Sequence, residues 1–186
     1  MARAKQKSAG GRTQDAISLL KADHRQVEEW FEQFEKARDS DRKQKLATQI
    51  CQALRVHTII EEEIFYPAFL EATDNTDIHH EAEVEHNGAK KLIAEIEESS
   101  PDDEYFDAKV TVLSEMIKHH VKEEEKPGGM FAEARGSEMD LEALGEQLAA
   151  RKAELEGGEG EDMEGMPPGG GRKSRGQEGR LMKGGR

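Results

Sequence analysis

The stretch His57-Thr58-Ile59-Ile60-Glu61 decides the fold that we expect, together with a second copy at His120-Val121-Lys122-Glu123-Glu124. Each stretch places a histidine four residues before a glutamate, and on an α-helix two such side chains lie on one face. An imidazole nitrogen beside a carboxylate oxygen suits a first-row metal such as iron, manganese or zinc. One pair proves little, because a histidine beside a glutamate is usually solvated. Two pairs within apolar stripes indicate a metal-binding helix face.

Apolar residues around these stretches recur with the period of an amphipathic helix. They predict four long helices, at about residues 14–38, 41–66, 76–98 and 102–126. The inward stripe of the first helix is Ile17, Leu20, His24, Val27, Phe31 and Phe34, and that of the second is Leu46, Ile50, Ala53, His57, Ile60 or Glu61, and Ile64. The stripe of the third is His79, Ala82, His86, Ala89, Ile93 and Ile96, and that of the fourth is Phe106, Val110, Leu113, Ile117, His120 and Glu124. Thr13 is expected to cap the first helix, and Pro67 to end or kink the second. Since no alternating pattern predicts a strand, we expect an all-α protein with an antiparallel up-down four-helix bundle.

The rest of the chain divides into shorter segments. We expect a flexible basic arm at 1–12, the bundle at 13–135, an additional C-terminal helix at 136–156 and a disordered Gly-rich tail at 157–186. Ser137 is the candidate cap of the additional helix, whose apolar face consists of Leu141, Leu144, Leu148 and Leu155. This face is expected to pack on the bundle or to join two chains as a homodimer. The tail is too polar to offset its ordering entropy by burial.

Composition limits the classes of partner. The chain has 186 residues, a formal net charge of −13 and 5% aromatic residues. Residues 1–12 and 172–186 are basic, so the segment between them is strongly acidic and is not expected to bind nucleic acid. No apolar run approaches the roughly 20 residues of a membrane span, and residues 1–12 lack the apolar core of a secretory signal. One cysteine, Cys51, fits a cytoplasmic setting.

Each predicted stripe contains one histidine, and these histidines lie at similar depths in the bundle. Counted from the helix ends, the depths agree within about one turn, or ~6 Å, for His24, His57, His86 and His120. The spacing from His24 to His57 is 33 residues and that from His86 to His120 is 34, so the chain reads as two helical hairpins. Each hairpin also offers one glutamate that could bridge two metals. The four histidines and two glutamates would supply six ligands to two metals. They leave coordination positions open for solvent, an oxo or hydroxo bridge, or a small molecule.

A set of motifs resembles the bacterial hemerythrin-like, or HHE cation-binding, family over about residues 14–135. The motifs are Asp23-His24, His57-x-x-x-Glu61-Glu62-x-Ile64-Phe65-Tyr66-Pro67, Glu81-Ala82-Glu83-Val84-Glu85-His86 and His119-His120-x-x-x-Glu124-Glu125. The resemblance implies a four-helix bundle with a non-haem di-iron centre, two iron ions per chain, that binds dioxygen or nitric oxide. The ligands that it implies by position are His24, His57, Glu61, His86, His120 and Glu124.

Two departures from the family pattern bear on function. Lys90 stands where oxygen-carrying members have a second histidine one turn after the third-helix ligand, which argues against reversible oxygen transport. Residues 126–131 form a looser end to the second hairpin than residues 63–67 form in the first. The resemblance thus implies a metal- and small-ligand-binding protein, in sensing, redox-stress response or iron handling, rather than an enzyme. The alternatives are a di-iron peroxidase or oxidase, an iron donor for cluster repair, and a metal-free interaction module.

Other histidines compete with these candidates. His119 has its own glutamate four residues on, but the continuous stripe favours His120 and leaves His119 as a flank. His79 lies on the third stripe and is expected near the bundle end rather than in the metal site. His80 is expected to be exposed.

Three further residues receive weaker metal interpretations. Tyr66 is expected first of all in the core, with metal ligation or hydrogen bonding as the minor reading. Glu83 and Glu85 are expected to be surface charges. The spacing Glu83-x-x-His86 matches the ferritin-like di-iron class, but neither His57 nor His120 repeats it, so the ferritin reading is weak.

Overall fold

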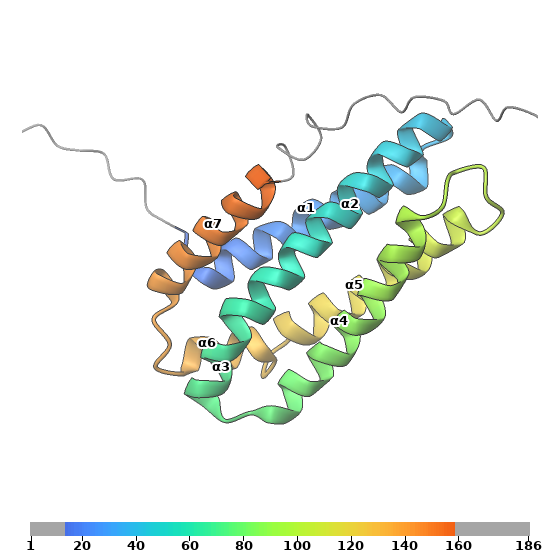
Figure 1. The fold of residues 1–186 in the computed structure, drawn as a ribbon. Helices are drawn as coiled ribbons and strands as arrows, with labels where there is room; N and C mark the ends of the chain where they lie inside the picture. The colour runs from blue at the N-terminus through green and yellow to red at the C-terminus, as the bar shows by residue number, and fades with distance from the viewer. Residues whose placement is uncertain (1–13, 159–186) are drawn as a thin grey trace, which may run out of the picture.

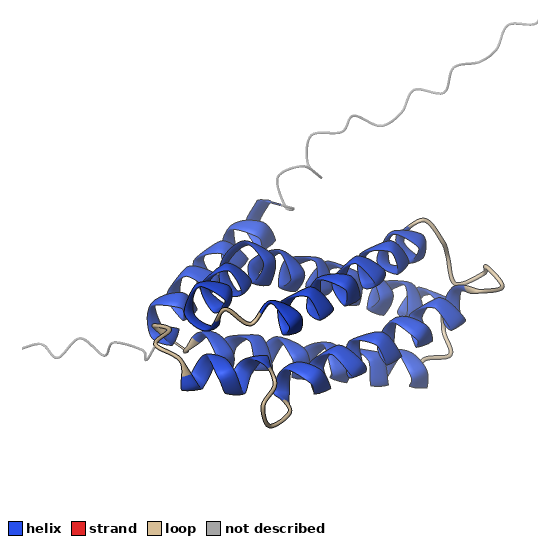
Figure 2. Ribbon diagram, turned by 90° about the horizontal axis from the view of Figure 1, so that it is seen from below, coloured by secondary structure: helices blue, strands red, loops and turns tan. Residues whose placement is uncertain are grey.

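Residues 14–158 are described by the computed structural model, and all regular elements among them are helical (Figure 1). The long helices are α1 (Ala16–Lys36), α2 (Ser40–Ile60), α4 (Thr76–Glu97) and α5 (Phe106–Glu125). Consecutive long helices run in opposite directions, and both α1 and α4 pack on α2 and α5. Figure 2 shows the helices joined by loops. The prediction of an all-α helical bundle is confirmed.

Short polar side chains fix where three of the helices begin. The side chains of Asp15, Asp39 and Asn75 each accept a hydrogen bond from the backbone N–H group three residues further on. Such caps satisfy donors that the first helical turn leaves unpaired. The expected cap Thr13 lies outside the described residues, and Asp15 caps α1.

The chain stays helical past Pro67, where the second helix was expected to end or kink, but as separate elements after α2. After α2 the chain forms the π-helical turn η1 (Glu61–Phe65) and then α3 (Tyr66–Thr73). Pro67 lies in the first turn of α3, where a missing N–H group is tolerated. Asp74, with a φ of 54°, ends α3 in the left-handed conformation.

After α5 the chain forms a short helix inside the range predicted for the bundle, and then the additional helix predicted at 136–156. α6 (Met130–Gly136) precedes α7 (Leu141–Gly158), and Ser137 ends α6 rather than beginning α7. Asp140 caps α7, since its side chain accepts a hydrogen bond from the N–H group of Ala143. α7 extends two residues beyond its expected end at residue 156, into the predicted tail. The remainder of that tail, and the basic arm, lie outside the described residues.

α7 packs on α1, α2 and η1 of its own chain (Figure 1). Leu144 and Leu148 are buried there, and Gly145 lies against the start of α1. A Cβ atom on Gly145 would be 2.2 Å from the carbonyl oxygen of Gln14, so this close approach requires glycine. The apolar face of α7 is therefore used within the chain, and the homodimer remains a prediction.

The apolar core consists of two clusters. The α7-side cluster contains Ile17, Leu20, Ile60, Phe65, Phe69, Phe131 and Leu148. The far cluster contains Val27, Phe31, Leu54, Ala89, Ile93, Phe106 and Leu113. On α1, for example, Leu20 belongs to one cluster, Val27 belongs to the other, and His24 lies between them. Within residues 14–158, no helix is long and apolar enough to cross a membrane.

Candidate metal centre

Four buried histidines meet in pairs between the two clusters. The Nε2 atoms of His24 and His57 are 3.1 Å apart, and those of His86 and His120 are 3.2 Å apart. Each of these side chains is at most 6% exposed. One pair comes from α1 and α2 and the other from α4 and α5, as the two-hairpin pattern predicts.

Two buried glutamates join the histidine pairs. Oε2 of Glu61 is 3.3 Å from Nε2 of His57 and 3.4 Å from Nε2 of His86. Oε2 of Glu124 is 3.5 Å from Nε2 of His24 and 3.6 Å from Nε2 of His120. Each carboxylate thus faces one histidine of each hairpin, which is the arrangement of a ligand that bridges two metals. The structure brings all six predicted residues together.

The geometry of these atoms suits metal ions. One ligand atom from each of His24, His57 and Glu61 lies within 4.8 Å of the others, and the same holds for Glu61, His86 and His120. Oε1 of Glu61 and Oε2 of Glu124 are buried and find no hydrogen-bond partner among the described residues. Leaving such oxygens unpaired is costly. Imidazole and carboxylate together form a donor set for iron, manganese or zinc. The residues present therefore fit a pair of first-row metals.

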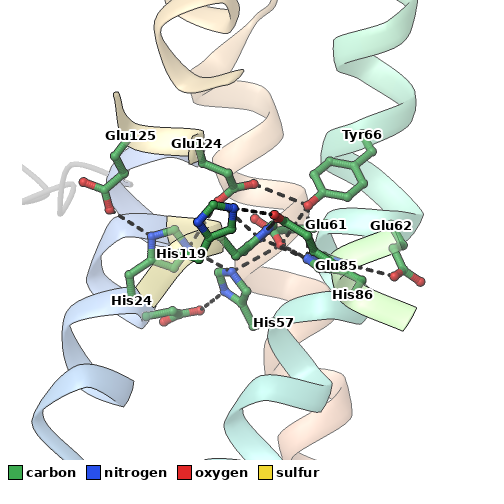
Figure 3. A network of polar contacts seen from close by, with 12 residues as sticks. His24, His57, Glu61, Glu62, Tyr66, Glu85, His86, His119, Glu124 and Glu125 are labelled. Atoms are coloured by element: carbon green, nitrogen blue, oxygen red, sulfur yellow. Dashed lines mark hydrogen bonds and ion pairs between the residues drawn. The ribbon is translucent and has the colours of Figure 1, made fainter. Parts of the chain in front are cut away.

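A ring of outer carboxylates faces the Nδ1 atoms of the same histidines (Figure 3). Glu125 lies 2.9 Å from Nδ1 of His24, and Glu62 lies 3.0 Å from Nδ1 of His86. Glu85 lies 2.7 Å from Nδ1 of His120, and Asp23 lies 3.6 Å from Nδ1 of His57. At His24, His86 and His120 the carboxylate is within hydrogen-bond distance, where it holds the proton on Nδ1 and turns Nε2 toward a metal. Nδ1 of His57 faces Asp23 without a hydrogen bond among the described residues. The ring repeats in the two hairpins, because each carboxylate adjoins one of the six central residues in sequence.

Sequence reasoning placed Glu85 at the surface, and this was wrong. Its side chain is 28% exposed and contacts both His120 and His119. The sequence does contain a signal for this role, because Glu85 directly precedes His86 as Asp23 directly precedes His24 in the other hairpin. Glu83 is exposed, as expected.

Tyr66 is closer to the centre than the sequence indicated. Its hydroxyl is 3.1 Å from Nε2 of His86, 3.3 Å from Oε1 of Glu124 and 3.5 Å from Oε2 of Glu61 (Figure 3). In an α-helix, residues five apart are rotated by about 140°, so Glu61 and Tyr66 would not share a face. The wider turn of η1, in which the N–H group of Tyr66 bonds to the carbonyl of Glu61, brings both side chains inward.

The pKa values of the two central glutamates are shifted in opposite directions. Burial would raise the pKa of Glu61, but the charge of His57 and hydrogen bonds from His57 and His86 lower it well below its usual value. Burial and the charge of Glu61 raise the pKa of Glu124 to about 8. The metal-free centre thus favours one ionised and one protonated carboxyl group.

The pKa values of the two histidines of the first hairpin are also shifted in opposite directions. Burial lowers the pKa of His24 to about 4. Burial acts in the same direction on His57, but the charges of Glu61 and Asp23 outweigh it and raise its pKa to about 10. Burial and the surrounding carboxylates raise the pKa of Tyr66 well above its usual value, which keeps its hydroxyl protonated.

The comparisons with known proteins agree with this geometry. Residues 15–127 match the model of the hemerythrin HHE cation binding domain. The chain belongs to this family. A solved structure of a hemerythrin HHE cation binding domain-containing protein from Mycobacterium kansasii, an Rv2633c homologue, has a TM-score of 0.68. It is 21% identical and covers 82% of this chain and 93% of its own, so it supports the fold.

A curated relative of this HHE protein carries a different name. A "DNA nickase" from Nostoc sp. (strain PCC 7120 / SAG 25.82 / UTEX 2576) is 26% identical over 143 residues, which is 74% of this chain. The match spans only 39% of the Nostoc protein.

The remaining candidates lie outside the centre of the HHE domain. His119 is 64% exposed and forms a flank, and His80 is exposed, as expected. His79 packs edge-on against Tyr66, with ring centroids 5.6 Å apart. Lys90, at the position of the missing family histidine, pairs with Glu62 at 2.5 Å. Lys90 therefore holds an outer carboxylate and does not face the centre.

Proposed function

We propose that this HHE domain holds two non-haem iron ions, one at each histidine pair, and that the pair binds dioxygen or nitric oxide. The observation that carries the proposal is the position of the two glutamates. Glu61 and Glu124 each face one histidine of both hairpins at 3.3–3.6 Å, and each has a buried oxygen without a hydrogen-bond partner among residues 14–158. An isolated polar cluster of this size would be costly to bury, whereas metal ions would satisfy it.

A bound di-iron pair would supply two adjacent redox-active Lewis acids, which take up a diatomic molecule and exchange electrons with it. The chain's own residues hold and shield that pair. Glu61 and Glu124 set the spacing, and the outer carboxylates orient the histidines. The Tyr66 hydroxyl can donate its proton to the hydrogen bond with Oε1 of Glu124, 3.3 Å away.

A small cavity supports a diatomic ligand. It has a volume of about 20 Å³ and lies beside the histidines, on the side of the far cluster. Its other walls are formed by Asp23, Thr58 and four apolar side chains, Val27, Leu54, Ile117 and Val121. A space of this size holds one molecule about as large as water, and its apolar walls favour a neutral guest.

Metal analysis tests this proposal directly. Protein purified without oxygen should contain about two irons per chain, and exposure to air should change its optical spectrum. His57→Ala should lower the iron content, whereas His80→Ala, which alters an exposed histidine of α4, should leave it unchanged. Well-folded wild-type protein without metal would refute the proposal and support the metal-free interaction module.

Two enzymatic alternatives use the same centre. A peroxidase or oxidase would consume peroxide or dioxygen in turnover, and Tyr66 beside His86 is the group that favours this reading. An iron donor would instead release its metal to an acceptor. Turnover with peroxide, measured on iron-loaded protein, distinguishes a peroxidase or oxidase from a protein that only binds its ligand. Transfer of iron to an apo-cluster protein would identify an iron donor.

The name of the Nostoc relative adds DNA as a candidate substrate. The negative charge of the chain disfavours binding to a phosphate backbone. Incubation of iron-loaded protein with supercoiled plasmid provides the test, and we expect no nicking above that of a His57→Ala control.

A further inference from the structure

A second cavity, of about 90 Å³, is lined both by two residues of the metal centre and by carboxylates nearer the molecular surface. It lies between the first turns of α4 and the segment that joins α5 to α6. Its inner wall contains His120 and Glu124, and its outer wall contains Glu81, Glu85 and Glu123. Among the described residues that line it, Lys126 is the single lysine or arginine, and it pairs with Glu123. The passage is therefore predominantly acidic.

The cavity exists because the two hairpins end differently. Five residues after Glu61 the chain places Tyr66, whose ring occupies the space beside the centre. Five residues after Glu124 it places Gly129, which has no side chain. A Cβ atom on Gly129 would lie 2.2 Å from the carbonyl oxygen of Glu123 and 2.8 Å from that of Glu124, so the chain can turn away here only at a glycine.

The inner end of the passage carries an unsatisfied acceptor. Glu124 is 3% exposed, and its Oε2 atom has no hydrogen-bond partner among the described residues. Toward the surface, the carboxylates become progressively more accessible, with Glu85 and Glu123 half-buried and Glu81 exposed. Carboxylates in this order can replace the hydration shell of a divalent cation step by step. Acidic clefts with low-dielectric walls also raise the local concentration of cations and their on-rates.

We propose that this acidic passage is the route by which ferrous ion enters the centre. The proposal rests on the proposed function, because it assigns an entrance to the same iron site. It also separates the path of the cation from the apolar cavity, which is on the far-cluster side of the histidines and suits a neutral ligand. Entry past Glu81 brings the ion first to Glu124 and His120, so the second hairpin should receive iron before the first.

The test is the rate at which metal-free, full-length protein takes up ferrous ion without oxygen, followed in a stopped-flow instrument by competition with a chromophoric chelator. Glu81→Lys reverses one exposed charge at the mouth and leaves the ligands intact. We expect uptake about tenfold slower at low ionic strength, with unchanged final iron content. The difference should shrink in 1 M salt, where the screening length falls to about 3 Å. Glu123→Gln should slow uptake in the same direction.

Glu115→Lys is the matched control, since it makes the same charge change at an exposed position of α5 away from the passage. Uptake at the wild-type rate in this variant, with slower uptake in Glu81→Lys, supports the proposal. Equal rates in all three proteins, or equal slowing in both variants, would overturn it. Wild-type protein that takes up no iron would instead refute the proposed function itself, so the two failures are distinguishable. The reaction of loaded protein with dioxygen should be unaffected by Glu81→Lys, because dioxygen is uncharged.

Discussion

Tyr66 shows how one hydroxyl group can be part of a site without belonging to its motif. It lies 3.1–3.5 Å from a histidine and from both glutamates of the centre. We expect Tyr66→Phe to fold and to retain iron with an affinity lowered about 10- to 100-fold, as for other groups that support metal ligands. Competition with a chelator measures this change. Tyr105→Phe, at a side chain that is 65% exposed, is the control and should have no effect.

Glu124 should make the metal-free protein less stable at neutral pH. Its pKa in the folded state is about 8, above the usual value of 4.5, because of burial and the charge of Glu61. A group with a raised folded pKa contributes stability below its unfolded pKa, and this contribution is lost as the pH rises toward the folded pKa. Metal-free Glu124→Gln should therefore be more stable than wild type at pH 8, with the difference closing toward pH 4.5.

Urea denaturation of both proteins at several pH values measures this difference. The same variant should bind less iron, since an amide cannot replace an ionised bridge. A metal-free Glu124→Gln protein that is no more stable than wild type at pH 8 would contradict the assigned pKa.

At the scale of elements, α7 contacts one of the outer carboxylates of the centre although it lies outside residues 15–127, which match the family. Its Lys152 pairs with Asp23, the carboxylate beside Nδ1 of His57. We expect Lys152→Met to lower iron affinity about tenfold, because it frees an outer carboxylate to turn away from its histidine. Arg151→Gln, on the same helix, breaks an exposed pair with Glu63 and should leave affinity unchanged. Equal losses in both variants would indicate a general loosening of α7 instead.

Helical periodicity explains both what the sequence predicted and what it missed. The stripes of α1, α4 and α5 are regular, so counting steps of three and four placed four polar residues of the centre correctly on inward faces: His24, His86, His120 and Glu124. The burial of Tyr66 was expected, but the π-helical turn η1 breaks the count after Glu61, so the contact of its hydroxyl with the centre could not be derived from α-helical spacing. Glu85 was missed for another reason: its role depends on a contact across two helices, to His120 of α5. Spacing along one helix does not report such a contact.

At the scale of the whole molecule, two close approaches of glycines to backbone atoms determine features that the short motifs do not predict. The direction taken by the segment after Pro127 depends on Gly129, which packs against backbone carbonyls of α5. Likewise, whether the leucines of α7 face the bundle or a second chain depends on the contact of Gly145 with the start of α1. The contact of Gly145 joins residues that are distant in the sequence, and that of Gly129 depends on a close backbone approach. Neither can be predicted from the spacing of apolar residues, whereas the bundle itself follows from that periodicity.

The two apolar clusters have a consequence for the cooperativity of unfolding. His24, His57 and their counterparts separate the clusters, so few apolar contacts join the two ends of the bundle through the core. Bound metal would link all four long helices at that level and couple the ends. We expect metal-loaded protein to unfold in one transition and at higher temperature. Metal-free protein should lose hydrogen-exchange protection first at one end, with the other end still folded. Calorimetry and hydrogen exchange on both forms measure this directly, and identical single transitions would show that the helices alone make the bundle one cooperative unit.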